Sequence, residues 1–311
     1  MRSIIIAATA TVTLFSSPAF PQQPNQGAAS IPDFSGNWSR PYVWGFEPPS
    51  SGPGPVVNKS RRRQVFDADR HPLPPANAPL VADSVLLIGD YTNPILKTDA
   101  GEVVKKHGEI ILTGVTYPTP ANQCWPGGVP FIFWFPGMVM LQQPDKITML
   151  YGTNEFRQVR MNQPHLAPVT PSWYGDSVGH YESDTLVIDT VGIKIGPYAM
   201  VDMFGTPHTE ALHVVERYRL LDYAAAKEAW ERTENFRISD AIMEVDPTYK
   251  GKGLQLQFMV EDEGVFTMPW SATVTYRRAL GEPFEWVCAE NPHKYNTEKD
   301  AAVPTADKPD F

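Results

Sequence analysis

Short apolar runs separated by turn residues form the main pattern of the chain from about Val81 onward. Runs of this length and composition, spaced in this way, are typical of an all-β barrel or sandwich. The runs are Val85 to Ile88, Glu109 to Thr113, Met138 to Gln142, Lys146 to Tyr151, Glu155 to Met161, Val178 to Glu182, Thr185 to Thr190, Ala211 to Leu220, Leu254 to Val260 and Ser271 to Arg277. Only one helix is expected, from Tyr223 to Arg232, with Asp222 as its N-cap.

Residues 20–80 lack this pattern because they are rich in proline and glycine and have almost no periodicity. We interpret them as an extended arm that follows residues 1–19 and precedes a β-barrel domain over residues 81–311. Phe34 and Trp38 are the aromatic residues through which we expect the arm to pack on the barrel.

The run LHVVERYRL contains a charged residue on its apolar face. Successive residues of a strand point to opposite sides of a sheet. Glu216 therefore shares a face with Leu212, Val214, Tyr218 and Leu220. The pattern predicts that Glu216 points into the barrel.

The first 19 residues have the features of a secretory signal peptide. Arg2 precedes an apolar run from Ile4 to Phe15, and Ser17-Pro18-Ala19 follows it. The run is shorter than the ~20 apolar residues that span a membrane as a helix, and no other stretch approaches that length. We expect a periplasmic or secreted protein with no membrane insertion.

The acidic composition argues against anionic partners. The net charge of −9 becomes −10 once Arg2 is removed with the leader. A nucleic-acid partner is not expected, and neither is binding to an anionic membrane surface.

Cys124 and Cys288 are the two cysteines of the chain. An even pair in an oxidising compartment predicts a disulfide bond between them. The alternative, a zinc site, lacks the additional nearby ligands that such a site needs.

Several segments resemble those of a widespread family of secreted bacterial proteins of unknown function. They are PDFSGNW, CWPGGVP, WYGDSVGHYESDTLVIDT, PHTEALHVVERYR and FTMPWSATVTYRR, in this order along the chain. The resemblance implies a shared fold and a secreted location. It does not indicate any particular activity. Tyr181 and Ser183 stand where that family often has Trp and Gly.

Gly36-Asn37-Trp38 is similar to the Gly-x-Trp motif that opens the first strand of lipocalins, which are calycin-type barrels. In those barrels the Trp closes one end beneath an Arg from the last strand. The similarity favours a single antiparallel barrel of this type over a sandwich. It implies that Arg277 or Arg278 covers Trp38.

The stretch WYGDSVGHYESDTLVIDT, residues 173–190, gathers acidic and imidazole side chains around a tight turn at Ser183-Asp184. His180 and Glu182 share one strand face, which points either to a reaction centre or to solvent. A metal-dependent enzyme is a second alternative, because the His-x-Glu spacing recurs at His208 and Glu210, close to His213. No complete metal signature is present, and no metal is predicted.

Glu216 is the leading candidate for proton transfer, since burial without a partner raises the pKa of a carboxyl group. We expect His180 to be the second proton-transfer group and Asp176 to orient it. The alternative is that Glu216 forms an ion pair with an inward arginine. The arginines available for that pair are Arg157, Arg160 and Arg277.

A small apolar or aromatic molecule is the expected substrate. Its predicted binding residues are Tyr218, Trp173, Tyr174, Glu182, His208, Trp270 and Arg277. Gly175-Asp176-Ser177-Val178-Gly179 has the GxSxG spacing but runs into an expected hairpin strand and not a strand-to-helix turn, so it is not a nucleophile elbow. No P-loop or GxGxxG motif is present, and serine hydrolases and nucleotide-dependent enzymes are therefore not expected. The sequence thus favours a cofactor-free acid–base enzyme of lyase, hydratase or isomerase type. A periplasmic carrier of a small hydrophobic ligand is the alternative, and the oligomeric state stays open.

Overall fold

A computed structural model describes residues 31–280, apart from residues 41, 44, 64, 67–71, 74–79, 83–86, 116, 153–154, 235–236 and 240–247. The predicted signal peptide lies outside these residues. Cys288 also lies outside them, so the disulfide to Cys124 stays a prediction.

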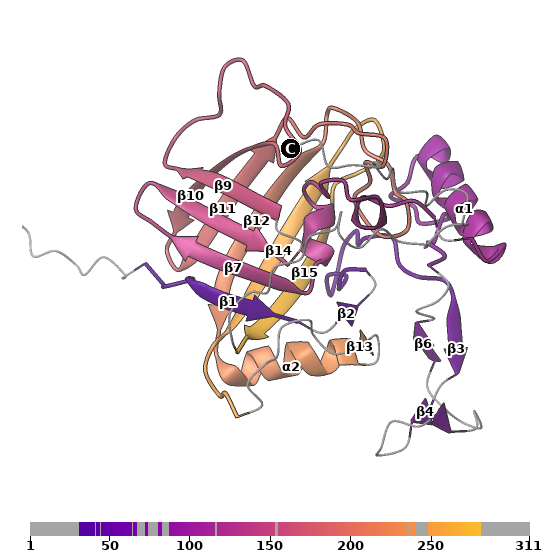
Figure 1. The fold of residues 1–311 in the computed structure, drawn as a ribbon, viewed down its shortest axis with the longest axis horizontal. Helices are drawn as coiled ribbons and strands as arrows, with labels where there is room; N and C mark the ends of the chain where they lie inside the picture. Colours follow the sequence, from indigo (N-terminus) through magenta and orange to yellow (C-terminus); the bar gives the residue numbers. More distant parts are fainter. Residues whose placement is uncertain are drawn as a thin grey trace, which may run out of the picture. The chain divides into compact units, whose positions relative to one another are not determined.

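A closed barrel of nine strands forms the body of the described chain (Figure 1). In order around the barrel they are β1 (Gly36–Ser39), β15 (Trp270–Arg278), β14 (Gly253–Glu261), β12 (His213–Leu221), β11 (Thr185–Val191), β10 (Asp176–Glu182), β9 (Glu155–Met161), β8 (Lys146–Tyr151) and β7 (Gly137–Gln142). Neighbouring strands are antiparallel except β9 and β10, which are parallel. The barrel prediction is confirmed, and the sandwich alternative is wrong.

Short two-stranded pairs lie outside the barrel. They are β2 (Tyr42–Val43) with β13 (Arg237–Ser239), β3 (Arg61–Arg63) with β6 (Leu80–Ala82), and β4 (Val65–Phe66) with β5 (Pro72–Leu73). Two 3-10 helices, η1 (Ala121–Gln123) and η2 (Phe131–Trp134), precede β7, and every side chain of η2 is buried.

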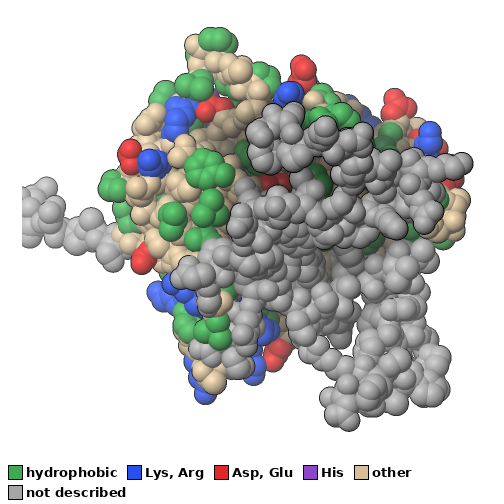
Figure 2. Space-filling model, in the orientation of Figure 1, with side chains coloured by type: hydrophobic (Ala, Val, Ile, Leu, Met, Phe, Trp, Pro, Cys, Tyr) green, Lys and Arg blue, Asp and Glu red, His purple; other side chains and the backbone are tan. Residues whose placement is uncertain are grey.

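Alternation along the strands sends one face of each into the core. On β12 the buried residues are Val214, Glu216 and Tyr218, whereas Val215 and Arg217 between them are only partly buried. The inward position predicted for Glu216 is therefore confirmed. On the outer face of β7 and β9, Leu141 and Phe156 are about half exposed, and Figure 2 shows hydrophobic side chains among charged ones there.

The predicted boundary between arm and barrel is wrong at one place. Phe34 and Trp38 are buried as expected, but β1 itself is a barrel strand that pairs with β7 and β15 and closes the sheet. The guanidinium of Arg278 lies 5.0 Å from the Trp38 ring centre, and its Nη1 donates to the Ser35 carbonyl at 2.8 Å. Gly36 has φ 133°, and a Cβ there would meet that guanidinium. The Trp–Arg closure implied by the lipocalin similarity is present.

Two α-helices occur among the described residues, where one was predicted. α2 (Tyr223–Glu234) packs against β12, β14 and β15, and the Asp222 Oδ1 accepts the Ala225 N–H at 2.9 Å, which confirms the N-cap. α1 (Thr98–Leu112) was missed, and the strand expected over Glu109 to Thr113 is wrong. Its buried residues Ala100, Val104, His107 and Ile111 recur three or four apart, which is the helical period.

The hairpin of β10 and β11 has the turn that the sequence predicts. Glu182 pairs with Thr185, and Ser183 has φ 59°, as a two-residue connection requires. No helix among the described residues is long and apolar enough to cross a membrane.

Candidate functional site

Glu216 lies inside the barrel in an ion pair with Arg157 of β9. The two guanidinium nitrogens of Arg157 donate to Oε1 at 2.6 Å and to Oε2 at 2.9 Å. The Tyr218 hydroxyl donates to Oε2 at 3.0 Å. Neither charged side chain is more than 1% exposed. Both carboxylate oxygens thus accept from the charged guanidinium, and Oε2 also accepts from a neutral phenol.

The remaining N–H groups of Arg157 are also used. They donate to the Ser177 and Thr190 hydroxyl oxygens at 2.8–3.2 Å. Burial alone would lower the pKa of the Arg157 guanidinium, but the Glu216 carboxylate outweighs it and raises the pKa. The expectation of an unpaired Glu216 is wrong, and the alternative of pairing with an inward arginine is confirmed for Arg157.

His180 does not converge with Glu216. Glu216 is in register with Ile188 and, through it, with Gly179, whereas His180 is in register with Val187. Neighbouring residues along β10 face opposite sides, so His180 points outward. Its Nε2 lies 3.2 Å from Glu182 Oε1, and both side chains are about half exposed. The predicted pairing is wrong, and the solvent-facing alternative is confirmed.

Asp176 also lies on the outer side of β10, away from Glu216. Its carboxylate accepts from Arg160 at 2.7 Å and from the Leu166 N–H at 2.9 Å, and His165 Nδ1 is 2.9 Å away. Burial raises the pKa of Asp176, but these contacts outweigh it and the pKa is lowered. Asp176 therefore orients His165, which the sequence analysis did not select, instead of His180.

Two other predicted binding residues lie apart from each other. Trp270 is buried inside the barrel, where its ring contacts those of Phe258 and Phe266. Arg277 lies outside, with its guanidinium 4.6 Å from the Trp230 ring centre of α2. Neither forms a site with Glu182, which also binds Arg217 on the outer face.

Trp173 and His208 do come together, at a narrow hollow with aromatic walls. Trp125 meets Trp173 edge-on with ring centres 5.4 Å apart, and Tyr198 lies 6.1 Å from Trp125. Lys194 Nζ is 4.9 Å from the Trp173 ring centre. His208 is largely buried, which lowers its pKa, so its imidazole is neutral at neutral pH. The full lining is Pro120, Trp125, Pro126, Gly127, Gly128, Trp173, Ile193, Lys194, Gly196, Tyr198, Ala199 and His208.

Glu155, at the start of β9, contacts one of the residues that line this hollow. Its Oε1 accepts the N–H of Gly127, a lining residue, at 3.0 Å. Its Oε2 is buried and has no hydrogen-bond partner among the described residues. A Cβ on Gly127 would lie 3.5 Å from Oε2 and 2.8 Å from the Phe131 ring. The carboxyl group thus contacts Gly127, which lines the hollow.

Burial raises the pKa of Glu155 to about 7, although the Gly127 N–H and the Tyr174 hydroxyl act to lower it. The pKa of Tyr174 is raised by burial and, secondarily, by Glu155, so its phenol stays protonated at neutral pH. A carboxyl group that titrates near neutral pH can both take and return a proton.

The sequence contains a signal for Glu155 that was not used. The run EFRQVRM was predicted as a strand, and its alternation sets Glu155, Arg157, Val159 and Met161 on one face. Two ionisable residues on the apolar face of a strand point to buried chemistry. Selecting Glu216 as the proton-transfer group overlooked Glu155 and treated Arg157 only as one of three available ion-pair partners.

The His-x-Glu pairs do not meet. His180 and Glu182 are exposed on the outer face of β10, whereas His208 lines the hollow. Within the described part of the chain, no three His, Cys, Asp or Glu side chains are arranged to hold a metal ion. No family model, curated protein or solved structure matches the chain.

Proposed function

We propose that this protein is a cofactor-free acid–base enzyme for a small aromatic or apolar molecule, with Glu155 as the proton-transfer group. The observation that carries the proposal is the buried Oε2 atom, which has no hydrogen-bond partner among the described residues. Buried carboxyl oxygens are nearly always paired in proteins, and the exceptions concentrate at functional sites. We further propose that the enzyme acts outside the cytoplasm, because residues 1–19 have the features of a signal peptide.

The environment of Glu155 suits reversible proton transfer at neutral pH. With a pKa of about 7, the carboxylate and the carboxylic acid are both well populated. The carboxylate form takes a proton from a substrate C–H bond onto Oε2, and the acid form returns a proton to the resulting carbanion or enolate. The neighbouring Tyr174 phenol, whose pKa is raised, is a neutral hydrogen-bond donor for the negative charge that develops.

The aromatic walls of the hollow suit a planar apolar substrate. Trp125, Trp173 and Tyr198 offer ring faces and edges, and His208 supplies a neutral polar contact. The hollow is narrow, so entry of a substrate requires a wall to move. Trp125 is 39% exposed and is the wall with room to swing toward solvent.

A lipocalin-like carrier is less well supported. Such a carrier holds its ligand inside the barrel. Here the Arg157–Glu216 pair and tightly packed apolar side chains, including Met138, Met140 and Phe258, occupy that space. Acid–base chemistry at the barrel end needs no internal cavity.

The test follows deuterium exchange into small aryl ketones dissolved in D₂O, detected by NMR. We expect the wild-type protein to accelerate exchange at the carbon next to the carbonyl, with a rate that rises as pH passes through about 7. Glu155→Gln removes the exchangeable proton while keeping the shape, and proton-transfer groups typically contribute ~100-fold or more. We therefore expect exchange with this variant to fall to the background rate.

Two further variants locate the effect. Gly127→Ala leaves the carboxyl group intact but adds a methyl group 3.5 Å from Oε2 and 2.8 Å from the Phe131 ring, which crowds the carboxyl group, and we expect it to slow exchange. Glu182→Gln, on the exposed outer face, is the matched control and should leave exchange unchanged. Equal rates for wild type and Glu155→Gln would contradict the proposal. Saturable quenching of tryptophan fluorescence by the ketones without any exchange would favour a carrier.

A further inference from the structure

Six charged or imidazole side chains form a continuous ribbon across the outer ends of five barrel strands. We call it the charge ribbon. Its members, in spatial order, are Arg160, Asp176, His165, Asp189, His213 and Glu261. Arg160 belongs to β9, Asp176 to β10, Asp189 to β11, His213 to β12 and Glu261 to β14. His165 is the one member that comes from a loop, residues 162–175, which connects β9 to β10.

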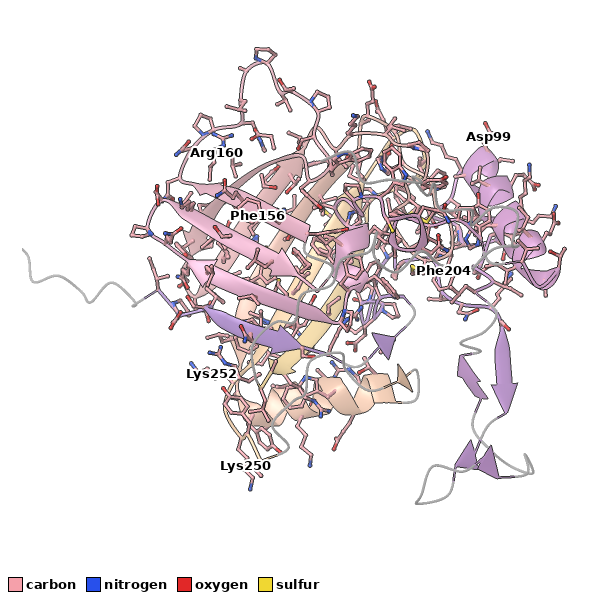
Figure 3. The ribbon with its side chains drawn as sticks, in the orientation of Figure 1. Asp99, Phe156, Arg160, Phe204, Lys250 and Lys252 are labelled. Carbon is pink, nitrogen blue, oxygen red and sulfur yellow. The ribbon has the colours of Figure 1, made fainter. Side chains whose placement is uncertain are left out.

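The course of this loop explains why it needs fastening. β9 and β10 are parallel neighbours, so the chain must return along the barrel before β10 can begin. Figure 3 shows Arg160 near the point where the loop leaves β9. The later part of the loop is held by backbone bonds, in which Ser172 N–H donates to the Gly192 carbonyl and Lys194 N–H donates to the Ser172 carbonyl. The earlier part depends on side chains, with His165 at its centre.

His165 contacts two carboxylates, and a neutral imidazole can donate a hydrogen bond to only one of them. Its Nδ1 lies 2.9 Å from Asp176 Oδ2, and its Nε2 lies 3.1 Å from Asp189 Oδ1. Both partners are acceptors when ionised, and a neutral imidazole carries only one N–H. Only the imidazolium form donates to both carboxylates at once. We propose that His165 is a pH-dependent latch that fastens residues 163–171 against β11 when protonated and releases them when neutral.

The charges around His165 support this direction. With both imidazoles protonated, the ribbon alternates three cations and three anions and has no net charge. With both neutral, it carries two uncompensated negative charges on adjacent strands. His213 shares Asp189 Oδ1 with His165 at 3.0 Å, and its Nδ1 faces Glu261 at 3.8 Å. Deprotonation therefore removes attraction at Asp189 from two sides.

The test is hydrogen–deuterium exchange of the amides of residues 163–171, corrected for the intrinsic pH dependence of the exchange reaction. It compares about pH 5.5 with about pH 8.5, on either side of the usual histidine range. The Leu166 N–H, which donates to Asp176 Oδ2, lies within this segment. We expect about fivefold stronger protection at the lower pH, the effect of a partly exposed ion pair worth ~1 kcal/mol. His165→Gln should show the weaker protection at both pH values.

His180→Gln is the matched control, because His180 also faces solvent beside a carboxylate but lies outside the ribbon. It should keep the full pH response. NMR of the histidine ring nitrogens in wild-type protein gives a second measurement that needs no variant. We expect both nitrogens of His165 to carry a proton at the lower pH and one at the higher. Equal wild-type protection at both pH values, or a pH response that survives in His165→Gln, would overturn the proposal. Neither result depends on Glu155.

Discussion

Glu216 of β12 is fully buried and Glu155 of β9 is partly buried with its Oε2 atom buried, and the two glutamates differ in what surrounds them. Glu216 meets a bidentate guanidinium and a phenol, with distances of 2.6, 2.9 and 3.0 Å to its oxygens. Glu155 meets one backbone N–H and the neutral Tyr174, and its Oε2 has no hydrogen-bond partner among the described residues. The carboxyl group of each is desolvated, fully for Glu216 and in large part for Glu155. The partners make Glu216 a structural ion and leave Glu155 able to exchange a proton.

Arg157 explains how the difference arises. It follows Glu155 by two residues on β9 and shares its face, yet its guanidinium N–H groups go to Glu216, Ser177 and Thr190. Among the described residues no cation therefore pairs with Glu155, and desolvation is the largest influence on its pKa. A buried acid on a strand face becomes a candidate for chemistry only when the nearby cation is already engaged elsewhere.

The largest expected effect comes from breaking the ion pair of Glu216. Glu216→Gln leaves the Arg157 charge buried without a counter-ion, so we expect the free energy of unfolding to fall by ~3–5 kcal/mol. Urea denaturation followed by circular dichroism measures it. A fall of less than ~1 kcal/mol would show that the ion pair does not carry the stability that its burial implies.

Two variants sharpen this result. Replacing both partners, Arg157→Met with Glu216→Leu, removes the stranded charge, and we expect it to recover most of the lost stability. Glu182→Gln cuts the exposed contact to Arg217 and should change stability by no more than ~1 kcal/mol.

Glu155, the other glutamate of the comparison, is expected to make the free energy of unfolding depend on pH. The pKa of Glu155 is about 7 in the folded protein against an ordinary value of 4.5, so the folded state holds a proton that the unfolded state has released. Its contribution to stability is complete below pH 4.5 and is lost as pH rises through about 7. We expect wild type to lose ~3 kcal/mol relative to Glu155→Gln across this window.

Urea denaturation of both proteins at a series of pH values measures this difference. Asp202, whose pKa burial raises to about 6, changes in the same sense. It is present in both proteins, so it cancels in the comparison. Parallel stability curves for wild type and Glu155→Gln would show that Glu155 has an ordinary pKa and no special capacity for proton transfer.

The sequence was informative wherever a local pattern decides the structure. Period-two alternation predicted most barrel strands and the inward position of Glu216, and turn chemistry predicted the connection at Ser183. Asp222 caps α2 as its residue type suggested. Each of these depends on a few consecutive residues and on the period of one element.

The site depended on long-range registers that no local pattern contains. That His180 faces away from Glu216 follows from the pairing of three strands, and Glu155 gains its importance only because Arg157 turns toward β12. His165 lies in a loop without periodicity, 24 residues before the Asp189 that it contacts. α1 was missed because its last turn, EIIL, reads as a short apolar run when taken alone.

His107 is a buried base, and its effect on the pH dependence of stability is expected to be opposite to that of Glu155. His107 of α1 is 1% exposed, and neither ring nitrogen has a hydrogen-bond partner among the described residues. Its ring packs against Tyr117 with centres 4.0 Å apart.

Desolvation lowers the pKa of His107 from 6.5 to about 4, so the unfolded state takes up a proton before the folded state does. The contribution to stability is complete above pH 6.5 and is lost as pH falls through about 4, opposite to Glu155. We expect wild type to lose ~3 kcal/mol relative to His107→Leu over this window. Between pH 4.5 and 6.5 the two groups oppose each other, so the wild-type curve alone conceals both. Thermal or urea unfolding of wild type, His107→Leu and Glu155→Gln over the same pH series separates them. His107→Leu and wild-type curves that stay parallel below pH 6.5 would mean that the imidazole gains a proton without leaving its pocket.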